Sequence, residues 1–220
     1  MTSNVPRIAL IHALPHSIAP INEAMARDWP QALRMNLMDD SLSADLAAGG
    51  GLNAAMHQRF QRLAQYAVES GSQAILFTCS AFGPCIEAVA RKHAPLPVLK
   101  PNEAMITDAA ATGLRVGLVA SFAPTLESMR PEFPAEVELE CALAAGALEA
   151  LNAGDTARHD DLICHAALEL ARRDCGVIAL AQFSMARTRS QVAAQTALPV
   201  LTTVDSAVVA LKQRLGAAAS

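Results

Sequence analysis

Residues 74–82 read Ala-Ile-Leu-Phe-Thr-Cys-Ser-Ala-Phe, and residues 177–185 read Val-Ile-Ala-Leu-Ala-Gln-Phe-Ser-Met. Each stretch is a short apolar run that leads to a polar residue, Cys79 in the first and Gln182 in the second. Apolar runs of this length are typical of parallel strands that are buried on both faces. Aligning Cys79 with Gln182 brings other segments into register, so the chain reads as two copies of one unit.

The duplication appears at several places in the same order along the chain. Leu-Pro-Val-Leu occurs at both 96–99 and 198–201, at nearly the same offset that separates Cys79 from Gln182. Upstream, Arg-Ile-Ala-Leu-Ile at the start of the first copy resembles Arg-Val-Gly-Leu-Val at the start of the second. A gene duplication is the simplest account of matches that keep their order with small gaps.

Both copies alternate aliphatic runs with longer amphipathic, Ala-rich stretches, which predicts an α/β fold. The expected strands cover 7–12, 33–38, 74–79, 97–99, 115–120, 136–141, 176–181 and 199–201. The expected helices cover 18–28, 54–69, 84–93, 103–111, 124–130, 159–173, 187–196 and 205–215. We expect two pseudo-symmetric lobes, 1–112 and 113–220, each a short parallel sheet flanked by helices, with the last helix able to pack on the first lobe.

Ligands of open parallel sheets bind outside the carboxyl ends of the strands. Cys79 and Gln182 both stand at such an end. The sequence therefore predicts an active site in a cleft between the two lobes. The triple glycine at 49–51 and Gly154 are expected in loops, and the triple glycine is interpreted either as the hinge of a lid or as a plain surface turn.

Composition narrows the function classes. Hydrophobic residues make up 52% of the chain and aromatic ones only 4%, so small aliphatic side chains must build the core. The formal net charge of −4 and the scattered Lys and Arg offer no basic surface to nucleic acid. No apolar stretch approaches the about 20 residues of a membrane span, and the N-terminal run, broken by His12 and Pro15, is unlike a signal peptide. We expect a cytoplasmic protein that binds neither nucleic acid nor membrane.

The cysteines are expected to be reduced thiols. Their number, five, is odd, and no secretion signal is expected, which argues against a disulfide framework. The Cys-x-x-Cys spacing is absent, and Cys79 and Cys85 are too far apart for the usual zinc knuckle, so no metal site is expected. Cys85, Cys141, Cys164 and Cys175 match no motif and are interpreted as packing residues.

The doubled unit, the apolar strand leading to Cys79-Ser80, and the Leu-Pro-Val-Leu strand before an acidic helix start resemble the aspartate/glutamate/hydantoin racemase superfamily. That superfamily also includes arylmalonate decarboxylase and maleate isomerase. The resemblance extends from Arg7 to Leu215. It implies a cofactor-independent enzyme that acts on a small carboxylate or carbonyl compound, often as a homodimer. In such enzymes, cysteines on opposite walls of the cleft add and remove a proton beside a carboxylate.

The two motifs of this chain depart from the family pattern. Typical members carry Cys-Asn-Thr or Cys-Ser-Thr after the first strand and Gly-Cys-Thr after the second. Here the first motif is Cys79-Ser80-Ala81, which keeps the thiol and one hydroxyl, and the second is Gln182-Phe183-Ser184, which lacks the thiol. These residues are the expected catalytic and substrate-binding positions at the two strand ends.

Cys79 is the expected catalytic residue. It precedes Ser80, Gly83 and a helix, and the dipole and free N–H groups of a helix N-terminus favour a thiolate. His12 closes the first strand, where family members place a polar residue beside the first cysteine. An imidazole there can orient or deprotonate Cys79, or it can simply cap a loop. In the second half, Ser121 and Thr125 are expected to bind substrate, with helix capping as the alternative for Thr125.

Gln182 restricts the reaction type, because a carboxamide neither removes nor supplies a proton near neutral pH. It can hydrogen-bond a substrate carboxylate or carbonyl. One-thiol chemistry of the isomerase or decarboxylase type is therefore expected ahead of two-base racemisation. Two alternatives remain open at this point: a cysteine amidohydrolase that uses Cys79 and His12, and a carboxylate-binding protein without turnover.

Overall fold

The chain forms two units that repeat one topology. The computed structural model describes residues 5–218, and the units comprise the chain up to Pro101 with the stretch from Ala207 onward, and Asn102–Ser206. The strands of the first unit are β1 (Arg7–His12), β2 (Leu33–Met38), β3 (Ala74–Phe77) and β4 (Val98–Leu99). Those of the second are β5 (Val116–Ala120), β6 (Leu139–Leu143), β7 (Val177–Leu180) and β8 (Val200–Thr202).

Both sheets are parallel and follow the same strand order, β2-β1-β3-β4 and β6-β5-β7-β8. The loops between strands repeat as well. The N–H of Thr78 bonds the carbonyl of Ile11 at 3.0 Å, and the N–H of Ala181 bonds that of Val119 at the same distance. These matching bonds immediately precede Cys79 and Gln182, so the two residues hold equivalent positions in their units.

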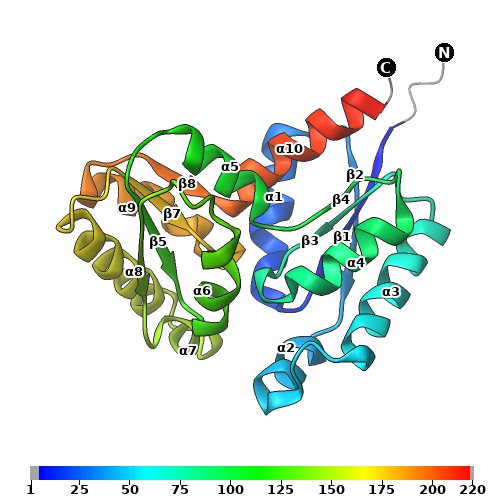
Figure 1. The fold of residues 1–220 in the computed structure, drawn as a ribbon, viewed down its shortest axis with the longest axis horizontal. Coiled ribbons are helices and arrows are strands. Elements are labelled where there is room, and N and C mark those ends of the chain that lie inside the picture. Colours follow the sequence, from blue (N-terminus) through cyan, green and yellow to red (C-terminus); the bar gives the residue numbers. More distant parts are fainter. Residues whose placement is uncertain (1–4, 219–220) are drawn as a thin grey trace. The chain divides into compact units, whose positions relative to one another are not determined.

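Helices connect the strands (Figure 1). In the first unit they are α1 (Ile18–Asp28), α2 (Ser41–Asp45), α3 (Ala54–Glu69) and α4 (Gly83–His93), with short turns η1 (Pro15–Ser17), η2 (Leu46–Gly50) and η3 (Ser80–Phe82). In the second they are α5 (Glu103–Ala111), α6 (Ala123–Met129), α7 (Ala147–Asn152), α8 (Thr156–Ala171) and α9 (Arg189–Thr196), with η4 (Arg130–Glu132) and η5 (Phe183–Thr188). The last helix, α10 (Thr203–Ala218), begins in the second unit and ends in the first. The predicted α/β class, with two short parallel sheets flanked by helices, is confirmed.

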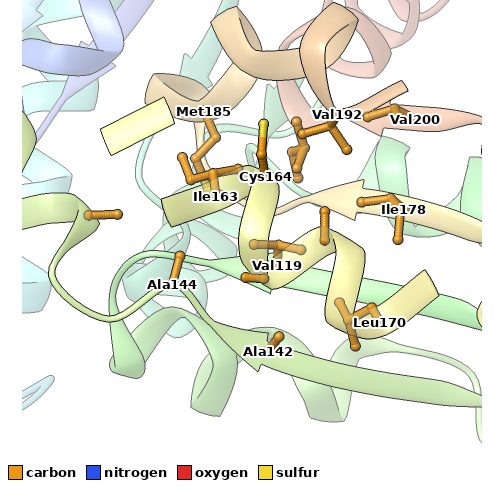
Figure 2. Packing of buried hydrophobic residues seen from close by; sticks show 14 of the residues in the cluster. Val119, Ala142, Ala144, Ile163, Cys164, Leu170, Ile178, Met185, Val192 and Val200 are labelled. Atoms are coloured by element: carbon orange, nitrogen blue, oxygen red, sulfur yellow. The ribbon is translucent and has the colours of Figure 1, made fainter. Parts of the chain in front are cut away.

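Side chains alternate between the two faces of the second sheet. Val119, Ile178 and Leu180 pack with residues of α8 and α9, including Leu170 and Val192 (Figure 2). The neighbouring positions in the same strands face α5 and α6. Both faces of the central strands β5 and β7 are therefore buried, which explains why these two strands are apolar runs without a polar alternation.

Aromatic rings fill the core of the first unit beside the end of β3. Phe60 of α3 stacks on Phe77 of β3 with ring centroids 5.2 Å apart, and it also lies 5.0 Å from Phe82. Contacts of this kind stabilise a core beyond the area that they bury. Three of the six phenylalanines of the chain thus pack together next to the position of Cys79.

The structure differs from the prediction in several places, among them α7, which was not expected. Strand β6 begins at Leu139 rather than 136, because the Val137 N–H bonds the Pro134 carbonyl and closes a turn. Residues 41–50, for which no helix was expected, form α2 and a π-helical turn in which Gly49, expected in a loop, has a left-handed φ of 88°. Helix α5 belongs to the second unit, so the division falls at Asn102 instead of residue 112.

Candidate active site

Cys79 stands at the carboxyl end of β3, where a buried strand gives way to a helical turn. Its backbone is extended (φ −121°, ψ 120°), and η3 begins at the next residue and runs into α4. The side chain is partly exposed, whereas the strand residues before it are fully buried. The strand end therefore presents a thiol at the surface of an apolar core.

A small apolar pocket lies against the thiol. Its lining residues come from β1 and the loop after it, α2, α3 and β3: Ile11, His12, Ala13, Leu42, Phe60, Phe77 and Cys79. The empty space is about 170 Å³, and it is too narrow to admit a water molecule. The sulfur is thus poorly hydrated on the side that faces the core.

Burial raises the pKa of the Cys79 thiol above its ordinary value, while the backbone N–H of Ala81 and the hydroxyl of Ser43 hydrogen-bond the sulfur and act in the opposite direction. The cost of desolvating a thiolate exceeds the gain from these two donors. Near pH 7 the neutral thiol is therefore the favoured form of Cys79, although the helix start favours the thiolate. The Ala81 N–H and the Ser43 hydroxyl are the groups that can stabilise the anion once it forms.

His12 does not serve as the direct base of Cys79, because both of its ring nitrogens are engaged elsewhere. Nδ1 lies 2.9 Å from the Thr78 hydroxyl, and Nε2 lies 3.0 Å from Oδ1 of Asn36. The side chain is fully buried, and this burial lowers the pKa of the imidazole despite the opposing contact with Asn36. His12 lines the same pocket as Cys79 but hydrogen-bonds its own network.

The tautomer of His12 follows from the neighbouring amides. The Asn22 Nδ2 donates to the Ile18 carbonyl at 2.8 Å and also to Asn36 Oδ1 at 2.9 Å, which fixes the orientation of both amides. Asn36 therefore presents an oxygen to His12, and Nε2 must carry the hydrogen. In the neutral ring Nδ1 then accepts from the Thr78 hydroxyl, so it has no lone pair left for a proton from Cys79.

Gln182 occupies the equivalent place in the second unit, as the extended residue (φ −129°, ψ 145°) immediately before η5. Its carboxamide oxygen accepts two hydrogen bonds from Ser121, from the backbone N–H at 2.6 Å and from the hydroxyl at 3.0 Å. Because an N–H can only donate, the atom facing it must be the oxygen. The side chain is partly exposed, and both of these bonds go to its oxygen, which leaves the hydrogens of the amide nitrogen, Nε2, to donate. Gln182 therefore offers hydrogen-bond donors and no free acceptor.

The remaining expected site residues are mostly covered. The side chains of Ser80, Ala81, Thr125, Phe183 and Ser184 are all at least nine-tenths buried. Ala81 contributes its backbone N–H to the sulfur of Cys79. In the first unit, the strand end carries Cys79 with Ser80 and Ala81. In the second unit, the equivalent strand end carries Gln182 with Ser121, Phe183 and Ser184.

Three polar residues next to Cys79 or His12 were not predicted from the sequence: Ser43, Asn36 and Thr78. An asparagine between Met35 and Leu37, as Asn36 is in β2, is the sequence signal for one of them. Thr78 precedes Cys79 directly and was overlooked because its strand neighbours are apolar. Ser43 carried no local signal.

The described residues show neither a metal site nor a membrane-spanning helix. Among residues 5–218, no three His, Cys, Asp or Glu side chains come together in a way that could hold a metal ion. No helix in the same part of the chain has the length and apolar character needed to cross a membrane.

The fold and the strand-end residues define an enzyme of the racemase/isomerase superfamily. Residues 18–211 match the Asp/Glu/Hydantoin racemase family, and the chain belongs to that family. No curated protein matches it by sequence.

Similar solved structures agree with this assignment. Aspartate racemase from Picrophilus torridus superposes with a TM-score of 0.72 at 12% identity, covering 95% of this chain and 94% of the other. Allantoin racemase from Klebsiella pneumoniae gives 0.72 at 18% identity, covering 97% and 89%. A glycine-to-cysteine variant of arylmalonate decarboxylase gives 0.65 at 18% identity, covering 96% and 94%. At these identities the likeness is one of fold.

Proposed function

We propose that this protein is a cofactor-independent enzyme that performs one-thiol acid/base chemistry on a small carboxylate or carbonyl compound, with Cys79 as the proton donor. The supporting observation is the asymmetry of two equivalent strand ends. One carries a partly exposed thiol with two hydrogen-bond donors beside it, and the other carries a carboxamide whose oxygen is bound by Ser121.

The raised pKa of Cys79 favours proton donation as the first step. A thiol that is neutral near pH 7 can protonate a carbanion or enolate, whereas a nucleophile or a base must first be a thiolate. The Ala81 N–H and the Ser43 hydroxyl then stabilise the sulfur anion that the step creates. The thiol state and its surroundings therefore match the role of a general acid.

A malonate-type substrate would be decarboxylated and then protonated. The bond from the α-carbon to one carboxylate breaks and carbon dioxide leaves. The electron pair of the broken bond stays on the substrate, which becomes an enediolate. The Cys79 S–H proton passes to the α-carbon, and the thiolate recovers a proton from water. For an isomerase, Cys79 would first have to lose its proton to water; the thiolate then takes a proton from one carbon and returns it to another as the double bond shifts, so no second proton donor is needed.

We propose that Gln182 binds the substrate through its free amide hydrogens. With the oxygen accepting from Ser121, these hydrogens suit a carboxylate or carbonyl oxygen. Two-base racemisation would need a second titratable group at this position, and a carboxamide supplies none. The amidohydrolase alternative needs an imidazole base for Cys79, and the contacts of His12 with Thr78 and Asn36 speak against one.

Alkylation of the thiols tests this proposal. Cys79 and Cys141 are the partly exposed cysteines, and the other three are buried. We expect iodoacetamide to label both, and small dicarboxylates such as malonate or maleate to protect Cys79 while leaving Cys141 unchanged, as read by peptide mass spectrometry. Equal labelling of Cys79 with and without every dicarboxylate would refute a carboxylate site at this thiol.

A further inference from the structure

A short helix of the first unit brings a hydroxyl to Cys79. Ser43 lies in α2 next to Leu42, which lines the same pocket as Cys79. Its Oγ donates to the carbonyl of Ala13, another residue of that pocket, at 3.1 Å, and its hydroxyl acts to lower the pKa of Cys79. A serine hydroxyl has one hydrogen but can accept as well. While Cys79 is a thiol, its S–H can therefore point to the Ser43 oxygen, and the Ser43 hydrogen can stay on the Ala13 carbonyl.

A thiolate changes this arrangement, because it has no hydrogen and can only accept. The Ser43 hydroxyl must then rotate from the carbonyl to the sulfur in order to remain bonded to Cys79. A hydrogen bond to an ion is about twice as strong as one between neutral groups, so the rotation is favoured once the proton has left. The proton of Ser43 stays on Ser43 throughout, and only its direction changes.

Helix α2 is held in a way that keeps Ser43 in place. Arg59 of α3 donates to both oxygens of Asp39, at 2.8 and 2.6 Å, and also contacts Asp45 and Ser41. These ion pairs fix the residues at either end of α2. Between them, Leu42 is buried in the apolar pocket next to Cys79. Helix α2 is thus held both by its ion pairs with Arg59 and by the burial of Leu42 in the core.

We propose that Ser43 is a positioning residue for Cys79, whose hydroxyl bonds the Ala13 carbonyl while the sulfur is protonated and turns to the sulfur when the proton leaves. The other titratable side chain that lines the pocket is His12, which is bonded to Thr78 and Asn36. The carboxylates flanking α2, Asp39 and Asp45, are paired with Arg59. No charged partner of Cys79 competes with Ser43 among the described residues.

The catalytic consequence rests on the proposed function, but the hydrogen bond can be tested without any substrate. The rate of Cys79 alkylation by iodoacetamide is measured from pH 6 to 11 by peptide mass spectrometry, because this rate follows the thiolate fraction. For Ser43→Ala we expect about tenfold slower alkylation of Cys79 on the rising part of the profile, since a donor to the anion is lost. Ser43→Thr, which keeps a hydroxyl, should restore most of the rate.

Ser41→Ala is the matched control, because Ser41 lies on the same helix but bonds Asp39 and Arg59 rather than the sulfur. It should leave the profile within about twofold of the wild type. An unchanged profile in Ser43→Ala overturns the proposal, and so does an equal loss in Ser41→Ala or Ser43→Thr, since either would trace the effect to displacement of α2. Failure of dicarboxylate protection would reject the proposed function while leaving this result intact.

Discussion

At the level of single residues, Cys79 and His12, which the sequence predicted to act together, have different hydrogen-bond partners. Cys79 is served by Ala81 and Ser43, whereas His12 is enclosed by Thr78 and Asn36. The imidazole therefore acts as a buried structural link between β1, β2 and the loop after β3. Its burial has a measurable consequence for stability.

Stability should fall below the ordinary pKa of histidine because of His12. Burial lowers the pKa of the folded imidazole from 6.5, so the unfolded chain binds a proton first as the pH falls. The contribution is present above pH 6.5 and is lost below it, with a slope of up to about 1.4 kcal/mol per pH unit. Urea unfolding at pH 7.5, 6.5 and 5.5 should show this slope for the wild type and a flatter one for His12→Gln.

His165 supplies the control, because its side chain is exposed beside Glu169. His165→Gln should keep the acid slope of the wild type. At pH 7.5, His12→Gln should cost about 1–3 kcal/mol, since buried partners lose a hydrogen bond. A His12→Gln protein with the same acid slope as the wild type would show that this imidazole does not stay neutral.

Gln182→Glu should weaken substrate binding without disturbing the fold. The new carboxylate can still accept from Ser121, but it replaces the amide hydrogens with a second acceptor that repels a carboxylate. We expect KM for a carboxylate substrate to rise about 10–100-fold, in line with the loss of a hydrogen bond to a charged group. Ser121→Ala keeps the hydrogen bond from the backbone N–H of residue 121 to Gln182, so it should raise KM less than about threefold. A KM that is unchanged in Gln182→Glu would remove Gln182 from the substrate site.

At the scale of elements, the repeated strands explain why one position differs between the copies. Ala9 in β1 corresponds to Gly117 in β5, which faces α8. A Cβ on Gly117 would lie 3.0 Å from Cβ of Leu170 and 3.1 Å from Cδ1 of Ile178. The close approach of α8 to the second sheet therefore requires glycine at this position.

Gly117→Ala should destabilise the protein by about 1–3 kcal/mol, because a methyl group overfills this packed contact. Gly216→Ala is the matched change, since a Cβ there meets nothing within 4 Å and lies in α10, so it should stabilise by up to about 1 kcal/mol. Thermal unfolding of both variants measures the difference. Equal melting temperatures would mean that α8 can move away from β5 at no cost.

Most strands and helices were predictable because their apolar period is long and regular. The limits of β2 and α3 match the expected ranges, whereas α2 was missed. Its sequence, Ser-Leu-Ser-Ala-Asp before a glycine run, is polar and short, and its place depends on Arg59 and Leu42. The contact of Ser43 with Cys79 joins residues far apart in the chain, and the thiol's protonation state follows from desolvation. Neither can be read from a local pattern.

At the scale of the whole molecule, each unit holds a buried thiol with a raised pKa. Burial raises the pKa of Cys85 in the first unit and of Cys164 in the second to about 11, from an ordinary value of 9.0. The folded chain therefore keeps these protons where the unfolded chain releases them. Their contribution to stability is complete below pH 9 and declines as the pH rises toward 11.

Replacing Cys164 by alanine should flatten this alkaline decline. The wild type should lose about 1–2 kcal/mol more between pH 9 and 10.5 than Cys164→Ala does, apart from a constant offset from the cavity. Urea unfolding at both pH values gives the slope for each protein. Parallel slopes would indicate that the Cys164 thiol ionises as readily in the folded chain as in the unfolded one.

Incorporation of solvent deuterium shows whether a single thiol, Cys79, supplies the proton. Wild type, Cys79→Ala and Cys85→Ala are incubated in deuterium oxide with malonates, maleate, amino acids and hydantoins, and the products are read by mass spectrometry and chiral chromatography. We expect turnover of a carboxylate substrate with deuterium delivered to one face, a loss of about 10²–10⁴-fold in Cys79→Ala, and little change in Cys85→Ala. Turnover that survives in Cys79→Ala, or deuterium delivered to both faces by the wild type, would contradict this expectation.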